Sequence, residues 1–485
     1  MTMLRCCFQP SDLADRWPFL KQAYLCGPDD VPWRTWTEVK PGMLTCVAEG
    51  ADSCSCHVLW PVTAYGCLGL RTTSLPERAE PYDLNIELVR GKMARVQEVQ
   101  RELEEGGVRA ASRARVAIRD VRQLFFDMLF RAPADAMAEL SDRCLSELVR
   151  IGDELILDYA RTISEQRKRL KQMPLLIVRA PCAAIHDVDL HELSRFVTTV
   201  QILAPWSEIE RQQGEYDWSE LDRAVTACRK AGLSVGLGPL VCWEKYALPD
   251  WLWLYTDRFD AILEFATRFV GAVTARYRDS VRVWELASRL NCGAALLFEA
   301  VERLQLAAGI AAAAAPNLDG GFCYITLGQP WSEYSAHVED TGAFYFADTL
   351  CRLGGTVRGL GIEITTGYGS GLSWPRDLVE IAYVLARYGS LGLPLVVTLA
   401  APVSPAASER TLVQTECLNG LQVGETPPPI EWVAHASCLA ASRPDVAALV
   451  WSHLTEHHLG MYPRAGFWGD PSLRTALLKG LRCEC

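Results

Sequence analysis

Short apolar segments alternate with helical segments through the last two thirds of the chain, and this alternation restricts the fold more than any other feature. The eight apolar segments, each of strand length, are PLLIVRA, FVTTVQILA, LSVGLGPLVC, VRVWELA, GFCYITLG, GLGIEITTG, LPLVVTLA and VAALVW. Helices are expected between them, for instance at residues 218–230, 261–277, 295–314 and 375–389. Eight strands alternating with helices predict an α/β fold, a (β/α)8 TIM barrel, over residues 174–485.

Two regions of different character precede the predicted barrel. Residues 1–81 are rich in Cys, Trp, Pro and Gly with short apolar stretches, which indicates a small β-rich domain. Residues 82–173 show helical spacing of apolar residues, interrupted at Gly106 and Gly107. Three amphipathic helices this close together predict a helical hairpin or bundle.

Charge and hydropathy restrict the partners and the location. The chain has 48 Lys and Arg against 59 Asp and Glu, a net charge of −11, so nucleic acid and anionic membranes are poor partners. The sequence contains no run of 18 or more apolar residues, the length that would be needed to span a membrane. The N-terminus lacks the apolar core of a signal peptide. We therefore expect a cytoplasmic protein whose 18 cysteines are thiols.

The cysteines do not show the spacing of a typical zinc site. Cys54 and Cys56, followed by His57, have C-x-C spacing rather than the C-x2-C pairs of a zinc ribbon. We interpret them as buried or incidental thiols, with metal binding as the weaker alternative, and expect neither a metal nor a cofactor.

Several stretches of the barrel follow a known pattern in the same order along the chain. The segment WSEIERQQGEYDW, then YALPDWL, LGLPLVVTLAAP and VWSHLTEHH with FWGDPSLRTALLKGL resemble motifs of glycoside hydrolase family 10, the endo-β-1,4-xylanases. The resemblance covers residues 174–485 and implies a TIM barrel that acts on a β-linked oligosaccharide. Residues 1–173 show no such resemblance.

The two catalytic positions of that family are changed here. The family places its acid at the end of a W-D-V-V-N-E strand and its nucleophile in T-E-L-D. The matching residues of this chain end in Arg289 and contain Leu399, respectively. Because arginine keeps its proton at any physiological pH and leucine cannot attack a sugar, the inherited pair is absent.

Other carboxylates lie at or beyond the ends of the predicted strands. Glu363, inside an apolar strand, and Glu333, in GQPWSEY, are the candidate relocated catalytic residues. Glu363 is alternatively a structural partner of Arg289, and Glu333 a solvated loop acid. Glu285 is expected in a buried layer below Arg289. The remaining candidate acids are Glu208, Glu210, Glu244 and Glu456.

Aromatic residues near strand ends are candidate substrate-binding residues. Trp206, Trp243, Trp331 and Trp451 either stack on sugar rings or cover the barrel core, and Arg289 would favour a carboxylate-bearing ligand such as a uronic acid. The segment SHLTEHH supplies a further polar group, which we interpret as a loop rather than a metal site. Its side chains are His453, Glu456, His457 and His458.

Three functional hypotheses follow. The first is a carbohydrate-interacting barrel without classical retaining xylanase activity. The second is an active, divergent glycoside hydrolase with relocated carboxylates such as Glu363 and Glu333, and the third is a scaffold for protein partners. The sugar, the linkage, the oligomeric state and the role of residues 1–173 stay open.

Overall fold

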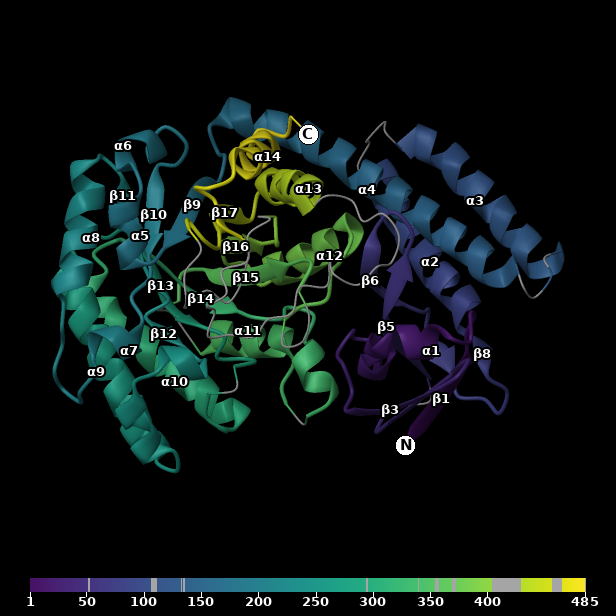
Figure 1. Ribbon diagram of the computed structural model, residues 1–485, viewed down its shortest axis with the longest axis horizontal. Coiled ribbons are helices and arrows are strands. Elements are labelled where there is room, and N and C mark those ends of the chain that lie inside the picture. Colours follow the sequence, from purple (N-terminus) through teal and green to yellow (C-terminus); the bar gives the residue numbers. More distant parts are fainter. Residues whose placement is uncertain are drawn as a thin grey trace.

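A closed barrel of parallel strands forms the centre of the computed structural model (Figure 1). The structure describes residues 1–50, 53–105, 111–131, 133, 136–293, 295–338, 340–353, 357–368, 372–403, 429–455 and 465–484. The barrel strands are β9 (Leu175–Ala180), β10 (Thr199–Ile202), β11 (Ser234–Leu237), β13 (Val283–Ser288), β14 (Phe322–Leu327), β15 (Leu360–Thr365), β16 (Leu395–Ala400) and β17 (Val446–Trp451). β17 pairs with β9 and β11 pairs with β13, which closes the ring. The short strand β12 (Val241–Cys242) extends the barrel beside β13. The predicted (β/α)8 barrel is confirmed.

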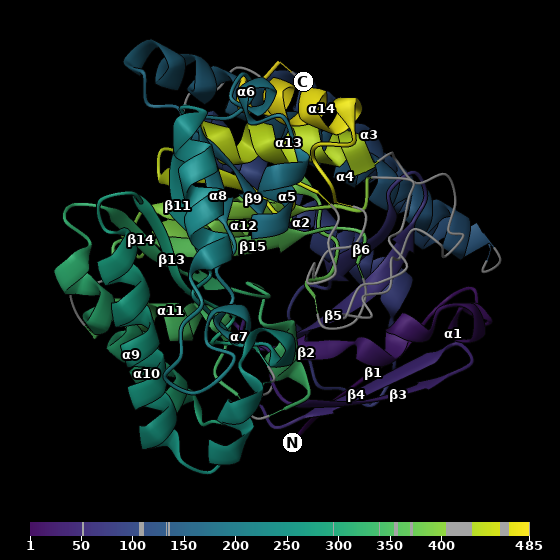
Figure 2. The same ribbon diagram turned by 60° about the vertical axis from the view of Figure 1, so that its left-hand side comes forward.

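Helices surround the barrel on its outer side. They are α5 (Cys182–Asp187), α6 (Leu190–Leu193), α7 (Trp206–Ile209), α8 (Ser219–Lys230), α9 (Phe259–Tyr277), α10 (Ala300–Ala314), α11 (Ala343–Arg352), α12 (Leu378–Gly389), α13 (Pro429–Ser442) and α14 (Pro471–Leu481). α8, α9 and α10 lie on the side away from the N-terminal strands (Figure 2). α10 and α12 begin later than their sequence pattern predicts, because Glu299 and Asp377 accept backbone hydrogen bonds as caps at their starts.

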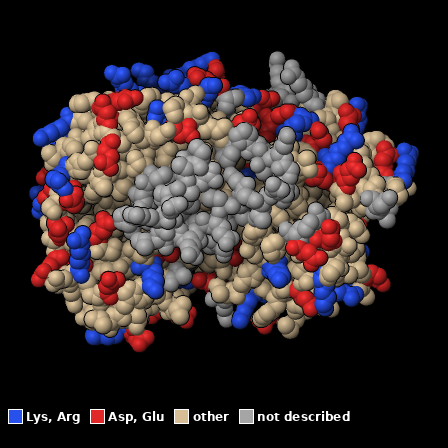
Figure 3. Space-filling model, viewed as in Figure 1, with Lys and Arg blue, Asp and Glu red and all other residues tan. Residues whose placement is uncertain are grey.

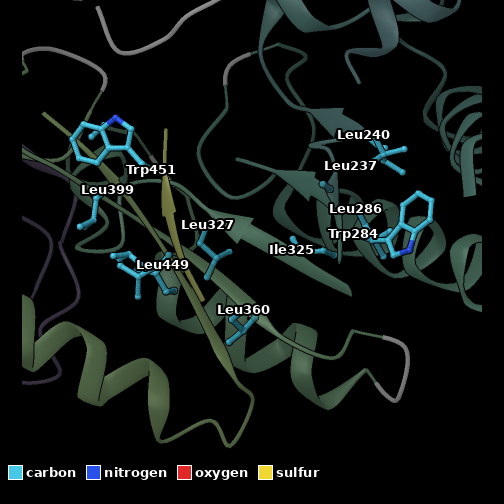
Figure 4. Packing of buried hydrophobic residues seen from close by; sticks show 14 of the residues in the cluster. Leu237, Leu240, Trp284, Leu286, Ile325, Leu327, Leu360, Leu399, Leu449 and Trp451 are labelled. Carbon is cyan, nitrogen blue, oxygen red and sulfur yellow. The ribbon is translucent and has the colours of Figure 1, made fainter. Parts of the chain in front are cut away.

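The strand that contains Trp284 shows how the barrel wall is packed. Glu285 points into the barrel, where it bonds to residues of other strands, so its neighbours Trp284 and Leu286 point outward. Both are fully buried in the layer between strands and helices. Figure 4 shows this layer, with Trp284 and Ile325 among the labelled apolar side chains. Trp284 is thus a packing residue of the barrel wall.

Two small sheets form the start of the chain, and their strand pairs are antiparallel apart from one parallel pair. One contains β1 (Thr2–Cys7), β3 (Thr35–Lys40), β4 (Met43–Ala48) and β8 (Tyr82–Asp83), and the other β2 (Tyr24–Cys26), β5 (Ser53–Val62), β6 (Gly66–Arg71) and β7 (Leu75–Pro76). The short helix α1 (Leu13–Arg16) follows β1. The predicted β-rich character of residues 1–81 is confirmed.

Three long helices connect these sheets to the barrel. They are α2 (Leu84–Glu105), α3 (Ala111–Arg131) and α4 (Met137–Leu170), as the helical spacing predicts. Leu148 of α4 belongs to the apolar core of the N-terminal sheets, whereas Ile156 and Ala160 belong to the barrel core. α4 therefore joins the two cores. The division of the chain into three domains stays a prediction.

No helix in the described ranges is long and apolar enough to cross a membrane. On the face shown in Figure 3, acidic and basic side chains are interspersed.

Buried charges hold α2 and α4 against α12. Lys92 of α2 forms an ion pair of 2.6 Å with Asp377, and the side chains are only 4% and 1% exposed. Asp153 of α4 accepts a hydrogen bond of 3.0 Å from the backbone amide of Leu378. Burial, and then the nearby Asp377 carboxylate, raise the pKa of Asp153 from its usual 3.8 to about 8. Asp377 thus has a charged partner in Lys92, while Asp153 is held by the backbone of Leu378.

The raised pKa makes stability depend on pH. Between about pH 4 and pH 8 the unfolded chain releases the Asp153 proton and the folded chain keeps it, so the free energy of unfolding falls as pH rises through this window. Asp153→Asn retains the acceptor for Leu378 and carries no charge. We expect this variant to lose that pH dependence and to be more stable than the wild type near pH 8, in urea unfolding followed at several pH values. Asp158→Asn, an exposed acid on the same helix, is the control and should keep the wild-type slope; equal slopes in all three proteins would contradict the prediction.

Candidate functional site

One arginine connects two carboxylates at the carboxyl end of the barrel. Arg289, directly after β13, donates from Nε to Oε1 of Glu244 at 2.6 Å and from Nη1 to Oε2 of Glu363 at 2.8 Å. The side chains of Arg289 and Glu363 are 5% and 7% exposed, and that of Glu244 is 19% exposed. The pair of Arg289 and Glu363 that the sequence suggested is present. Glu244 was only one of several acids near strand ends, and no sequence pattern indicated its partner.

Arg289, Glu244 and Glu363 form the Arg289 cluster, and the backbone around Arg289 is shaped to hold it. Arg289 has φ of 58°, in the left-handed region, so the chain turns sharply directly after β13. Asn291 donates to the carbonyl of Gly328 at 2.8 Å and accepts from the Gly328 amide at 3.1 Å, so it ties the end of β13 to the end of β14. These contacts fix the strand ends between which the guanidinium lies.

Gly328 leaves the space that the cluster occupies. A Cβ atom there would lie 2.7 Å from Nη1 of Arg289, 2.7 Å from Sγ of Cys292 and 3.1 Å from Oε2 of Glu363. Any larger residue must therefore displace the ion pair.

A second polar layer lies deeper in the barrel. Glu285 accepts hydrogen bonds from Arg179 Nη2 at 2.7 Å and from Thr326 Oγ1 at 2.6 Å, and it also contacts Gln201. Burial raises the pKa of Glu285. Its position below Arg289 agrees with the predicted buried layer, and its oxygens are occupied by protein donors.

Glu333 lies in a different environment from Glu363. It is buried against the N-terminal part of the molecule, where its Oε1 accepts from the Trp374 amide at 3.2 Å and from Arg376 at 3.1 Å. Tyr24 of β2 packs on Trp374 at a ring distance of 5.1 Å. Burial raises the pKa of Glu333. The interpretation as a solvated loop acid is wrong, because strands far away in the sequence cover this loop; the contacts of Glu333 do not include the Arg289 cluster.

The predicted aromatic side chains differ in exposure. Trp206, Trp243 and Trp451 are fully buried. Trp206 stacks on Phe269 at 5.2 Å, and Trp451 donates to the carbonyl of Ala465 at 2.7 Å. Trp243 packs on Phe298 at 5.7 Å, and its ring nitrogen has no hydrogen-bond partner. Trp331 alone of the four is partly exposed, beside Arg376. The structure therefore offers no free ring face at the first three.

The possible metal-binding groups are separated. Cys56 points into the core of the N-terminal sheets, and the adjacent His57 lies on the other face of β5, where its ring stacks on Tyr24 at 5.0 Å. His453 is buried and bonds to Ser452 at 3.0 Å, whereas the predicted loop residues Glu456, His457 and His458 fall outside the described residues. Within the described ranges, no group of three or more His, Cys, Asp or Glu is arranged to hold a metal ion.

Comparisons with known proteins found xylanases that are similar to part of this chain. No family model matches the chain. A curated endo-1,4-beta-xylanase 3 of Hypocrea jecorina is 25% identical over 115 residues, which make up 24% of this chain. The match spans 31% of the length of that curated relative.

Solved structures with the same type of barrel are also similar to this chain. Xylanase 10B from Thermotoga maritima has 14% sequence identity and a TM-score of 0.47, with 67% of this chain and 98% of that chain covered. Xylanase 10B from Thermotoga petrophila RKU-1, in complex with xylobiose, has 14% identity and a TM-score of 0.48, with 67% and 97% covered. The barrel resembles family 10 glycoside hydrolases, as the sequence motifs predict.

The role of Gly328 can be tested directly. We expect Gly328→Ala to lower the free energy of unfolding by about 1–3 kcal/mol, since the new methyl group overlaps Arg289 and Cys292. Gly271→Ala, in the middle of α9, is the matched control because its nearest atom is 4.0 Å away. This control should raise stability by about 0.4–1 kcal/mol. Chemical unfolding of both variants measures the difference, and an unchanged Gly328→Ala protein would show that the cluster does not need this space.

Proposed function

We propose that the barrel binds β-linked oligosaccharides and does not hydrolyse them by the retaining mechanism. The observation that carries this proposal is the position of Arg289, which stands where the resemblance places the family's acid and contacts both Glu244 and Glu363. Similarity to a curated xylanase supports a carbohydrate ligand.

Retaining hydrolysis needs two carboxyl groups about 5–5.5 Å apart with the sugar between them, one to donate a proton and one to attack. Here Glu244 and Glu363 both contact the same guanidinium, so a permanent cation occupies the place between them. A carboxylate that accepts a charge-assisted hydrogen bond from arginine is not placed to deliver a proton. Both groups are instead suited to accept hydrogen bonds from ligand hydroxyls with their remaining lone pairs.

Glu333 supports the same proposal. Its Oε1 is engaged by Trp374 and Arg376 in a contact with the N-terminal part of the molecule, and this arrangement favours a structural role over a relocated catalytic one.

A scaffold for protein partners is the second candidate. It is favoured by the burial of Trp206, Trp243 and Trp451, because a barrel that stacks sugars on these rings would expose their faces.

We further propose that the protein works in the cytoplasm. The buried neighbours Cys46 and Cys56 are thiols and are not joined in a disulfide, and this state is suited to a reducing compartment.

The proposal is tested with purified protein and xylo- and cello-oligosaccharides. We expect heat of binding in titration calorimetry and no reducing ends above the blank. Turnover that is lost in Glu363→Gln or Glu333→Gln would instead establish an active, divergent hydrolase. Neither binding nor turnover would favour the scaffold.

A further inference from the structure

The cluster at the barrel mouth carries excess negative charge. Two carboxylates, Glu244 and Glu363, contact a single guanidinium, and the deeper pair of Arg179 and Glu285 is balanced. A ligand carboxylate would have to approach Arg289 past two acids that already hold it. The cluster therefore disfavours a uronic acid and attracts a cationic group.

Two hydroxyl groups beside Glu363 lack hydrogen-bond partners. Thr398 lies opposite Glu363 in the register of β15 and β16, and Thr365 follows Glu363 by two residues on its own strand. Both threonines share the inward face of Glu363, because side chains alternate along a strand and paired residues point the same way. They are 1% and 4% exposed, and neither Oγ1 has a partner.

Unpartnered hydroxyls are costly in a protein interior, and their presence at one position is a sign of a ligand or water that bonds there. A hydroxyl both donates and accepts, so Thr365 and Thr398 suit the hydroxyl and ammonium groups of a small polar molecule. The missing partners of these two hydroxyls are an observation independent of the charge of the Arg289 cluster, and the two threonines lie next to that cluster.

We propose that the ligand of this site is an amino sugar, whose protonated amine pairs with Glu363 and Glu244 while Thr365 and Thr398 bond its hydroxyls. The inference rests on the proposed carbohydrate-binding function and specifies the sugar class within it. Charge selects the amine, because an ammonium offers three donors to acceptors that carry the excess negative charge.

The experiment compares three trisaccharides by titration calorimetry at about pH 6, where a sugar amine is charged. The probes are β-1,4-linked glucosamine trimer, its N-acetylated form, which has the same skeleton without the charge, and xylotriose. We expect the glucosamine trimer to bind at least about tenfold more tightly than the acetylated trimer at low salt, with a smaller difference in high salt. Equal affinities of the two trimers, or tighter binding of the acetylated one, would overturn the amino-sugar inference. If the amino-sugar inference fails but xylotriose binds, the proposed carbohydrate-binding function still holds. If none of the three probes binds, both the amino-sugar inference and the proposed function are overturned.

Variants test whether the Arg289 cluster causes the preference for the charged trimer over the acetylated trimer. Glu363→Gln should reduce the ratio of the affinities for the charged and acetylated trimers to near one. Glu244→Gln, at a more exposed position, should also lower this ratio without endangering the fold. Thr398→Val should weaken both trimers alike. Glu220→Gln, an exposed acid on α8, is the control and should leave the ratio unchanged. A ratio that survives in both Glu363→Gln and Glu244→Gln, in proteins that melt cooperatively, would place the selectivity elsewhere and refute the proposal.

Discussion

The barrel mouth depends on the ion pairs that the guanidinium of Arg289 forms with Glu244 and Glu363. A buried charge is costly to desolvate, and removal of one member of a buried ion pair leaves the other uncompensated. Glu363 is 7% exposed and finds its charged partner in Arg289, while Glu244 completes the cluster from the end of β12. Three backbone features support this geometry. They are the left-handed turn at Arg289, the hydrogen bond from Asn291 to Gly328, and the absence of a side chain at Gly328.

The same physical rule operates where the N-terminal part meets the barrel. Lys92 pairs with Asp377 and Arg376 pairs with Glu333, and all four side chains are buried. Since such charges need their partners, the N-terminal sheets and helices are linked to the barrel by specific contacts as well as by apolar packing. This contact covers the loops after β14 and β15, so the first part of the chain helps to shape the surroundings of the barrel mouth.

Much of the site could be predicted because parallel strands bring their carboxyl ends together. Arg289 and Glu363 lie at or near the ends of strands that were recognised from their apolar residues, and their pairing follows from opposite charge in one barrel. Glu244 was harder to assign, because several acids lie near strand ends and only the turn after β12 decides which one reaches Arg289. The burial of Glu333, Trp243 and Trp451 could not be predicted, since it depends on what packs over each residue.

The sequence by itself determined the barrel and the helices before it. These features are local, because strand and helix periodicity and the identity of a residue in a motif can be seen within a few neighbouring positions. Tertiary structure alone decided that one arginine holds two glutamates, that Tyr24 and Trp374 pack beside the loop of Glu333, and that three of the four candidate tryptophans are buried. Each of these depends on contacts between segments far apart in the chain, which no local pattern specifies.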